Sequence, residues 1–361
     1  MTHTLSRRHF LGAAGASAAA LTLAGKSSVF AADNVQIQQQ VWTGAQEIVP
    51  QKVASAFQAA NPGVSITVAP GSSNAVLNTI VAARKAGSPP PINVGFFNLE
   101  NTARGLAEDA WVALNAADVE NLDNIHDDFR LPNDVGAFPW IDLGGIIYNA
   151  EKVKEPPKSW KDLFDPKYHG RVATFDGFWT GNGVLATAYA NGGSIDDIEP
   201  ALKIYEEAAK SGHIHSLFNS NAQIQQLLAS GEVWIAPHFR GIVLPWIKEG
   251  APFGYAIPEE GQILFPEGFQ LLNGSTDDQL RVGRNLINES LTRENIIDYA
   301  VTASVVPVLK DNSGLPEELA NDPAVSSEQL AKALRLDYAK IAANHAGWLD
   351  QWNRRVKANL S

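Results

Sequence analysis

The sequence predicts an α/β fold of two lobes, each a mostly parallel sheet flanked by helices, joined by a hinge of two strands. Three observations lead to this prediction. Segments with strand periodicity alternate with segments of helical periodicity through the first and middle thirds of the chain. Two extended segments rich in Pro, Gly and β-forming residues flank the middle third. The 361 residues are enough for two domains of about 150 residues each.

The first lobe opens with a strand, a helix and a second strand. Residues 35–42 (VQIQQQVW) and 64–70 (VSITVAP) show the period of two that half-buried strands have. Between them, residues 50–63 carry apolar side chains at helical spacing and end in Asn-Pro-Gly, which stops a helix. A helix over 74–87 and a strand over 92–97 repeat the order. A sheet of parallel strands covered on both faces is expected.

The middle third repeats this alternation. Residues 170–176 (GRVATFD) predict a strand, and residues 201–212 and 221–231 predict two helices. The short apolar run 233–237 (VWIAP) predicts a buried strand. A second lobe of the same kind is therefore expected.

The chain is expected to cross between the lobes at residues 137–149 and 252–265. On this reading the first lobe consists of residues 32–140 together with 264–361, and the second lobe of residues 141–263. Two connecting strands make a hinge, and a hinge creates a cleft that can close on a ligand.

The last segment, residues 345–360, predicts a helix. Trp348 and Trp352 are four residues apart and therefore share one helix face. We expect this face to pack on the first lobe.

Residues 1–31 predict a cleaved export signal. Arg7 and Arg8 precede a short Ala/Gly-rich run over 12–25, which is the order of a twin-arginine signal, and VFA ending at Ala31 is the expected cleavage site. The alternative is an alanine-rich cytoplasmic tail, and the general export route is a second alternative. We expect a monomer in the periplasm.

Composition excludes several classes of function. There is no cysteine, so disulfides, thiolate metal sites, cysteine nucleophiles and a lipid anchor on cysteine are all excluded. Removal of residues 1–31 leaves 25 basic and 39 acidic side chains, a net charge of −14. Such a surface repels phosphate backbones, so nucleic acid is not an expected partner.

The most specific pattern lies at residues 144–176, which read GGIIYNAEKVKEPPKSWKDLFDPKYHGRVATFD, with LLASGEVWIA following at 227–236. These residues resemble the periplasmic solute-binding proteins of bacterial ABC importers, in the branch with spermidine/putrescine-binding and ferric-ion-binding members. The resemblance implies a type II periplasmic-binding-protein fold. It also implies capture, without catalysis, of a small polar organic solute that passes to an inner-membrane ABC permease. We expect no cofactor and no metal ion.

Arg240 comes just after the strand at 233–237. Ligands of open α/β sheets lie beyond the carboxyl ends of the strands, so His238, Phe239 and Arg240 are expected at the rim of the cleft. By resemblance, ferric-ion-binding relatives carry adjacent tyrosines where this chain has His238 and Phe239. Polyamine-binding relatives carry an acid where this chain has Ile242. Both departures disfavour the corresponding ligands.

The resemblance implies further ligand-binding positions, which combine aromatic rings with polar or acidic side chains. They are Trp42, Thr43, Asn98, Trp179, Thr180, Phe265 and Glu267. Phe239 and Arg240 join this set. Asp142, on the first crossover, is either a second partner for an amine or a structural counter-ion.

The expected ligand is a small amine-containing solute, either polyamine-like or a zwitterion such as a γ-amino acid. An ammonium against aromatic faces gains roughly 0.5–2 kcal/mol. Arg240 would bind a carboxylate through paired hydrogen bonds and Glu267 would bind the amine, so a zwitterion fits this set better. In the alternative, Arg240 forms a structural ion pair with Glu232, Glu249 or Asp142.

Rival functions rest on weaker patterns. A periplasmic enzyme would use His238 or His169 as a base, and His213 with His215 could ligate a metal ion. GNGVLA over 181–186 fits a dinucleotide fingerprint, but four residues separate it from its strand, whereas a dinucleotide turn is tight. A helix that starts near Gly183 and directs its backbone N–H groups at the cleft is the preferred interpretation.

Overall fold

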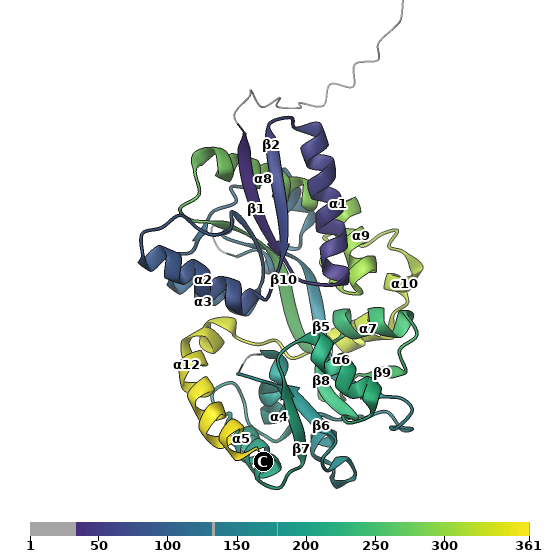
Figure 1. The fold of residues 1–361 in the computed structure, drawn as a ribbon. Coiled ribbons are helices and arrows are strands. Elements are labelled where there is room, and N and C mark those ends of the chain that lie inside the picture. Colours follow the sequence, from purple (N-terminus) through teal and green to yellow (C-terminus); the bar gives the residue numbers. More distant parts are fainter. Residues whose placement is uncertain (1–33, 132–133, 179, 361) are drawn as a thin grey trace, which may run out of the picture.

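The computed structural model describes residues 34–131, 134–178 and 180–360. They form two lobes, one above the other in Figure 1, with strands running between them. The predicted two-lobed α/β fold is confirmed. The predicted export signal and Trp179 lie outside the described residues. In the described part of the chain, no helix has the length and apolar character needed to cross a membrane.

Parallel strands form the outer part of the sheet in the first lobe. β1 (Val35–Val41) pairs in parallel with β2 (Val64–Pro70) on one side and with β3 (Val94–Asn98) on the other. Val53 and Phe57, four residues apart on α1 (Ala45–Ala60), pack into the apolar core beside these strands. The helices of this lobe are α1 (Ala45–Ala60), α2 (Ser73–Lys85), α3 (Leu99–Ala107), α8 (Asp277–Ser290) and α9 (Arg293–Ala303).

Two long antiparallel strands connect the lobes. β5 (Ala137–Asn149) coincides with the first predicted crossover, and β10 (Ile263–Leu272) pairs with it. The second crossover lies later than predicted, because the segment 252–265 is split. Its first part is β9 (Phe253–Ala256), which stays in the second lobe as a partner of β5. Gly261 then turns the chain at a φ of 108°, which an L side chain rarely adopts, before β10 begins.

The hinge strands make one continuous sheet of both lobes. The strand order is β2-β1-β3-β10-β5-β8-β6-β7. Three strands lie off this path: β4 (Trp111–Val112) pairs with β10, and β9 and β11 (Val306–Pro307) pair with β5. The outer strands of each lobe are parallel, whereas β5 and β10 run antiparallel to their neighbours.

The second lobe repeats the parallel arrangement. β6 (Val172–Phe175) pairs in parallel with β7 (Ile214–Phe218) and with β8 (Ile235–Phe239). β8 extends two residues beyond the predicted strand, so His238 and Phe239 are its last residues. The helices of this lobe are α4 (Val184–Ala190), α5 (Glu199–Lys210), α6 (Asn221–Ser230) and α7 (Arg240–Lys248).

The C-terminal helix packs differently from the prediction. α12 (Tyr338–Arg355) follows the short helices α10 (Glu317–Ala320) and α11 (Ser327–Lys332) and runs along the second lobe, in yellow in Figure 1. Trp348 and Trp352 share a buried face, as predicted, but their ring neighbours belong to the second lobe: Phe178 at 5.1 Å and Tyr205 at 5.4 Å between centroids.

The assignment of this helix to the first lobe is therefore wrong for its aromatic face. Arg355 at its end binds Glu199 at 2.7 Å and Glu206 at 2.7 Å, both on α5. The first turns of α12 also contact α3, so the helix touches both lobes.

Candidate functional site

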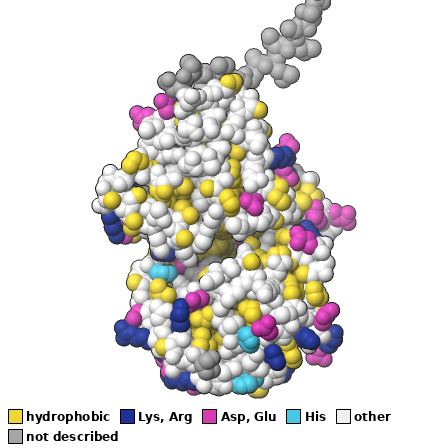
Figure 2. All heavy atoms as spheres, in the orientation of Figure 1, with side chains coloured by type: hydrophobic (Ala, Val, Ile, Leu, Met, Phe, Trp, Pro, Cys, Tyr) yellow, Lys and Arg dark blue, Asp and Glu magenta, His cyan; other side chains and the backbone are white. Residues whose placement is uncertain are grey.

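A cavity of about 330 Å³ lies between the lobes. Figure 2 shows the surface hollowed between its upper and lower halves. Most lining residues come from the carboxyl ends of strands and the helix starts that follow them, in both lobes, and the hinge strands add Asp142 and Phe265. The volume is at the lower end of the range of about 300–1,000 Å³ found for small-molecule sites. The geometry suits a small ligand.

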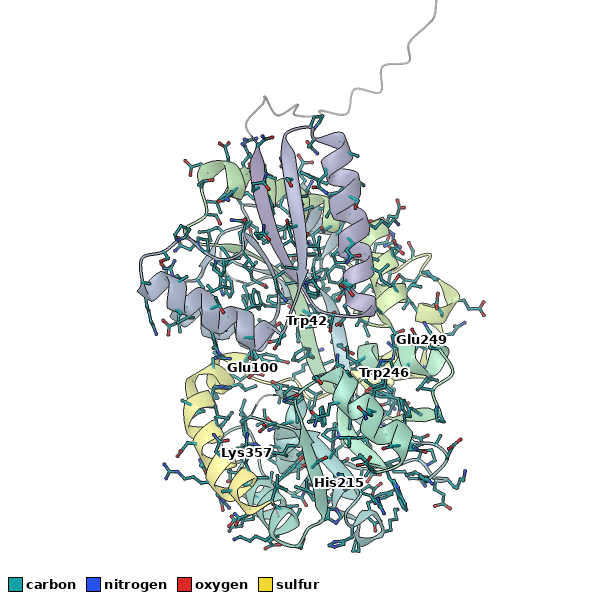
Figure 3. The ribbon with its side chains drawn as sticks, in the orientation of Figure 1. Trp42, Glu100, His215, Trp246, Glu249 and Lys357 are labelled. Atoms are coloured by element: carbon teal, nitrogen blue, oxygen red, sulfur yellow. The ribbon has the colours of Figure 1, made fainter. Side chains whose placement is uncertain are left out.

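Aromatic rings form much of the cavity wall. The ring centroids of Trp42 and Phe265 are 6.0 Å apart, and those of Phe265 and Phe239 are 4.4 Å apart. Trp42 lies at the junction of the lobes in Figure 3, with its indole N–H donated to Ser73. The apolar lining residues are Trp42, Phe175, Phe218, Pro237, Phe239, Ile242 and Phe265.

Polar side chains at helix starts form much of the remaining cavity wall. Asn98 is the N-cap of α3 and accepts the backbone N–H of Asn101 at 2.8 Å. Ser220 caps α6 and accepts the N–H of Gln223 at 3.3 Å. The start of α2 supplies three more polar lining residues. The uncharged polar lining residues are Thr43, Gln46, Ser72, Ser73, Asn74, Asn98, Asn101, Asn219, Ser220 and Asn221.

Asp142 is the one carboxyl among the described lining residues, and no lysine or arginine is among them. Its Oδ1 atom accepts the backbone N–H groups of Leu143 at 2.7 Å and Gly241 at 2.8 Å. Burial raises the pKa of this carboxyl to about 7, against the lowering effect of the two N–H groups and of Arg240. Asp142 can therefore change its charge near neutral pH.

His238 is a neutral member of the lining. Its ring stacks on Phe218 at 5.7 Å and meets Trp246 edge to face at 5.9 Å. Burial lowers its pKa to about 4, although the N–H of Phe239 at 2.8 Å from Nδ1 opposes this shift. Because Nδ1 accepts that hydrogen bond, the proton of the neutral ring is on Nε2. His238 can thus donate one hydrogen bond.

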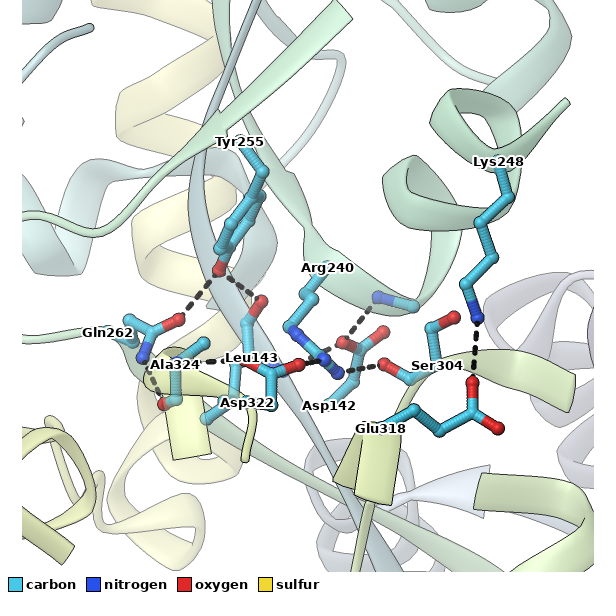
Figure 4. Close-up of polar contacts among 11 residues, drawn as sticks. Asp142, Leu143, Arg240, Lys248, Tyr255, Gln262, Ser304, Glu318, Asp322 and Ala324 are labelled. Carbon is cyan, nitrogen blue, oxygen red and sulfur yellow. Dashed lines mark hydrogen bonds and ion pairs between the residues drawn. The ribbon is translucent and has the colours of Figure 1, made fainter. Parts of the chain in front are cut away.

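Arg240 lies outside the cavity, contrary to its predicted role as a ligand contact. Figure 4 shows its guanidinium paired with Asp322 and donating to the carbonyl of Ser304. Arg240 and Asp322 instead border a separate cavity of about 390 Å³. The alternative of a structural ion pair fits this geometry. The direct counter-ion is Asp322, and Asp142, one of the three acids considered from the sequence, also interacts with the guanidinium electrostatically.

Glu267 also lies outside the cavity, in the core of the first lobe. Its carboxyl is fully buried, and the hydroxyl of Tyr299 donates to Oε1 at 3.3 Å. Burial raises the pKa of Glu267 well above its usual range, and the neighbouring Asp142 adds to this shift. An acid that is enclosed in the core and absent from the cavity wall does not contact a ligand there, so the structure does not bring Glu267 to the predicted binding site.

Thr180 is buried beside the cavity without lining it. Its backbone N–H and its hydroxyl both donate to Oε2 of Glu100, at 3.0 Å and 2.6 Å. Its neighbour Gly181 does line the cavity. Of the ten predicted ligand-binding residues, the structure brings together Trp42, Thr43, Asn98, Asp142, Phe239 and Phe265 in the cavity wall.

The sequence matches the family described as bacterial extracellular solute-binding protein over residues 52–327. The chain belongs to this family. A search of curated proteins found no match. Membership of this family gives the chain the role of binding a solute.

Solved structures of similar proteins share the two-lobed fold of this solute-binding protein. AgtB from A. tumefacien R10, in complex with agropinic acid, has a TM-score of 0.74 at 18% identity and covers 90% of this chain and 99% of its own. An ABC transporter substrate-binding protein from Bradyrhizobium japonicum gives 0.72 at 20% identity, with 91% and 100% covered. The spermidine/putrescine protein PotD from Streptococcus pneumoniae gives 0.69 at 17%, with 90% and 99% covered.

Most of the cavity wall in this solute-binding protein was not predicted from the sequence. Most of the missed polar residues follow β2 and β7, at positions 72–74 and 219–221, and the others are Gln46 and Asn101. The rule that pointed to Arg240, that ligands lie beyond strand ends, would also have pointed to these segments. Serine and asparagine after an apolar strand were the available signal.

The weaker patterns have structural explanations. His213 is buried with Nε2 at 2.9 Å from the carbonyl of Leu163. No group of three or more histidine or acidic side chains suited to a metal ion occurs in the ranges described. Gly183 precedes α4 with a φ of 84°, but the first N–H of that helix is taken by Asn182 Oδ1 at 3.0 Å. The N–H of Val184 is therefore not free to bind a ligand in the cleft, contrary to the prediction for this helix start.

Proposed function

We propose that this solute-binding protein captures a small amine-containing solute between its lobes in the periplasm and delivers it to an inner-membrane ABC permease. The similar solved structures include ABC transporter substrate-binding proteins, which supports the transport role. Export by the predicted twin-arginine signal and a monomeric state belong to the same proposal.

One observation supports a ligand with an amino group. Asp142 is the single charged side chain among the described lining residues, and aromatic rings surround the space that it faces. An ammonium would pair with this buried carboxylate and lie against the rings of Trp42, Phe239 or Phe265. With Arg240 as a neighbour the pKa of this carboxyl is still raised to about 7, so an ammonium in the cavity would supply the further positive charge that favours its ionised form.

The polar half of the lining supports an acidic group on the same ligand. The starts of α2, α3 and α6 meet at the cavity, and helix N-termini carry a partial positive charge that favours anions. His238 adds one N–H donor. A diamine requires two counter-charges, and Glu267 is not among the lining residues. A zwitterion such as a γ-amino acid therefore suits the site better than putrescine, even without Arg240.

Tyrosine-ligated ferric ion suits the site poorly. The described lining residues include one carboxyl and no tyrosine, whereas a hard trivalent cation needs several anionic oxygens. His238, the base of the enzyme alternative, has its Nδ1 atom engaged with the backbone.

A thermal-shift comparison of four probes tests the proposal. γ-Aminobutyrate, putrescine, butyrate and butylamine differ only in which charged ends they carry. A ligand at about 100 times its dissociation constant adds roughly 2.7 kcal/mol of stability. We expect γ-aminobutyrate to raise the melting temperature most and butyrate least. A larger shift with putrescine would contradict the zwitterion, and no shift with any amine would contradict the amine site.

A further inference from the structure

Glu100 forms a hydrogen-bonded link between the two walls of the cavity. It lies in the first turn of α3, between the lining residues Asn98 and Asn101, on the side of the first lobe that faces the second lobe in Figure 3. Its side chain is 2% exposed, an unusual position for a carboxylate. Buried charges need partners, and the partner of Glu100 comes from the opposite lobe.

That partner is Thr180, which donates two hydrogen bonds to Oε2. Thr180 begins the short turn η6 (Thr180–Asn182), which is itself anchored in the second lobe. Asn182 receives hydrogen bonds on its carbonyl from Thr174 at 2.7 Å and from Tyr205 at 3.1 Å. The bonds to Glu100 therefore join the first lobe to a turn that is hydrogen-bonded within the second lobe.

The C-terminal helix covers this link. Nδ1 of His345 on α12 lies 3.7 Å from Oε1 of Glu100, and within the described residues neither atom has a hydrogen-bond partner. Trp348, one turn further on, fixes α12 to the second lobe through Phe178. The second lobe thus meets Glu100 from two elements, η6 and α12.

We propose that Glu100 and Thr180 are positioning residues for solute capture: they form an interlobe clasp that closes together with the cavity and sets affinity without touching the solute. The affinity part of this proposal rests on the proposed function. Asn98, Asn101 and Gly181, which line the cavity, flank the two clasp residues in sequence. A ligand that draws these lining residues together also brings the clasp residues into hydrogen-bond distance. Opening would break the clasp and return Glu100 to water.

The first measurement needs no solute. Amide hydrogen exchange of Thr180 is compared in the full chain, in Glu100→Ala and in the control Glu108→Ala, an exposed position at the end of the same helix. Hydrogen bonds to a charged group protect an amide strongly, so Glu100→Ala should speed exchange at Thr180 roughly tenfold or more. The control should leave it unchanged. Equal exchange in the two variants would overturn the clasp.

The second measurement uses γ-aminobutyrate as the probe. We expect Thr180→Val, which keeps the backbone N–H but removes the hydroxyl, to weaken affinity several-fold through faster release. Glu100→Ala should weaken it roughly tenfold or more, and Glu108→Ala should not. Unchanged affinity in Thr180→Val and Glu100→Ala would overturn the proposal. Absence of binding by the unaltered protein would contradict the solute class, and the exchange comparison would then decide the clasp alone.

Discussion

Oδ1 of Asp142 accepts the backbone N–H of Gly241 at 2.8 Å, so the carboxyl that faces the solute cavity also caps the first turn of α7. Helix starts leave N–H groups without partners, and a side-chain oxygen that accepts one of them stabilises the helix. Asp142 therefore ties a hinge strand to a second-lobe helix while holding a charge for the ligand. The two roles can be separated by a substitution that keeps the oxygen and removes the charge.

Asp142→Asn is expected to weaken binding and to stabilise the unliganded protein. The amide oxygen can still accept the N–H groups of Leu143 and Gly241, but the counter-charge for an amine is lost. Affinity for γ-aminobutyrate should fall tenfold or more by titration calorimetry. Asp128→Asn, at an exposed acid, is the matched control.

The stability change has a defined pH window. The pKa of Asp142 is raised from 3.8 to about 7, so the native carboxyl lowers stability as the pH rises from about 4 through about 7. The asparagine variant does not titrate. Its melting temperature should exceed that of the unaltered protein at about pH 8, and the difference should shrink towards about pH 4. A variant that melts lower at about pH 8 would contradict this account.

Amine affinity should depend on pH through the same carboxyl. Below about pH 7 the free protein holds a proton on Asp142 that the ammonium must displace, so affinity should fall by up to about tenfold per pH unit. Calorimetry in buffers of different ionisation enthalpy would reveal the released proton. The Asp142→Asn variant should show a flat profile, and an equally steep profile there would assign the titration to another group.

Arg240→Ala is expected to destabilise the fold. The guanidinium and Asp322 form a largely buried pair, and removal of one partner leaves the other charge uncompensated, at a cost of about 3–5 kcal/mol. The double variant Arg240→Met with Asp322→Leu should lose less. Urea unfolding measures both, with Lys248→Ala, from an exposed pair, as the control. A stable single variant that no longer binds γ-aminobutyrate would return Arg240 to the site.

Trp352→Ala should destabilise the second lobe. The indole is fully buried against Tyr205, and large-to-small changes at such positions cost about 3–5 kcal/mol. Leu106→Ala, at an exposed apolar residue, is the control and should change stability little. Hydrogen exchange should then rise first in α5 and α12. If it rose first in the strands of the first lobe, the packing of α12 described here would be wrong.

Local patterns in the sequence were sufficient for much of this fold. The alternation of periods predicted β1, β2 and β3 with the helices between them, because apolar spacing is set within each element. Local patterns were insufficient to predict the ion pair of Arg240 and Asp322. These residues are 82 positions apart in the sequence and meet only after α7 and the segment that follows α10 have packed. The aromatic face of α12 was visible, but an apolar stripe does not specify which lobe covers it.

Glu267 illustrates the same limit within the site. Phe265, two residues earlier on β10, reaches the cavity, whereas Glu267 contacts Tyr299 in the core. The strand alternation gives both residues the same face. The pairing of β10 with β5 is regular from Phe265 to Glu267, so the two residues differ only in their position along the strand. Two residues advance a strand by about 7 Å, which places Glu267 beyond the cavity in the core of the first lobe, and a linear pattern does not show where a cavity ends.

β10 pairs with β3 of the first lobe and β5 pairs with β8 of the second lobe. Rotation of one lobe relative to the other must therefore twist the hydrogen-bonded ribbon that β5 and β10 form. Such a ribbon behaves as a torsion spring with a preferred rest angle. The return of the ribbon to its preferred twist would then favour release of the solute. The angle through which the lobes can rotate would be limited by the twist at which the hydrogen bonds between the strands lengthen.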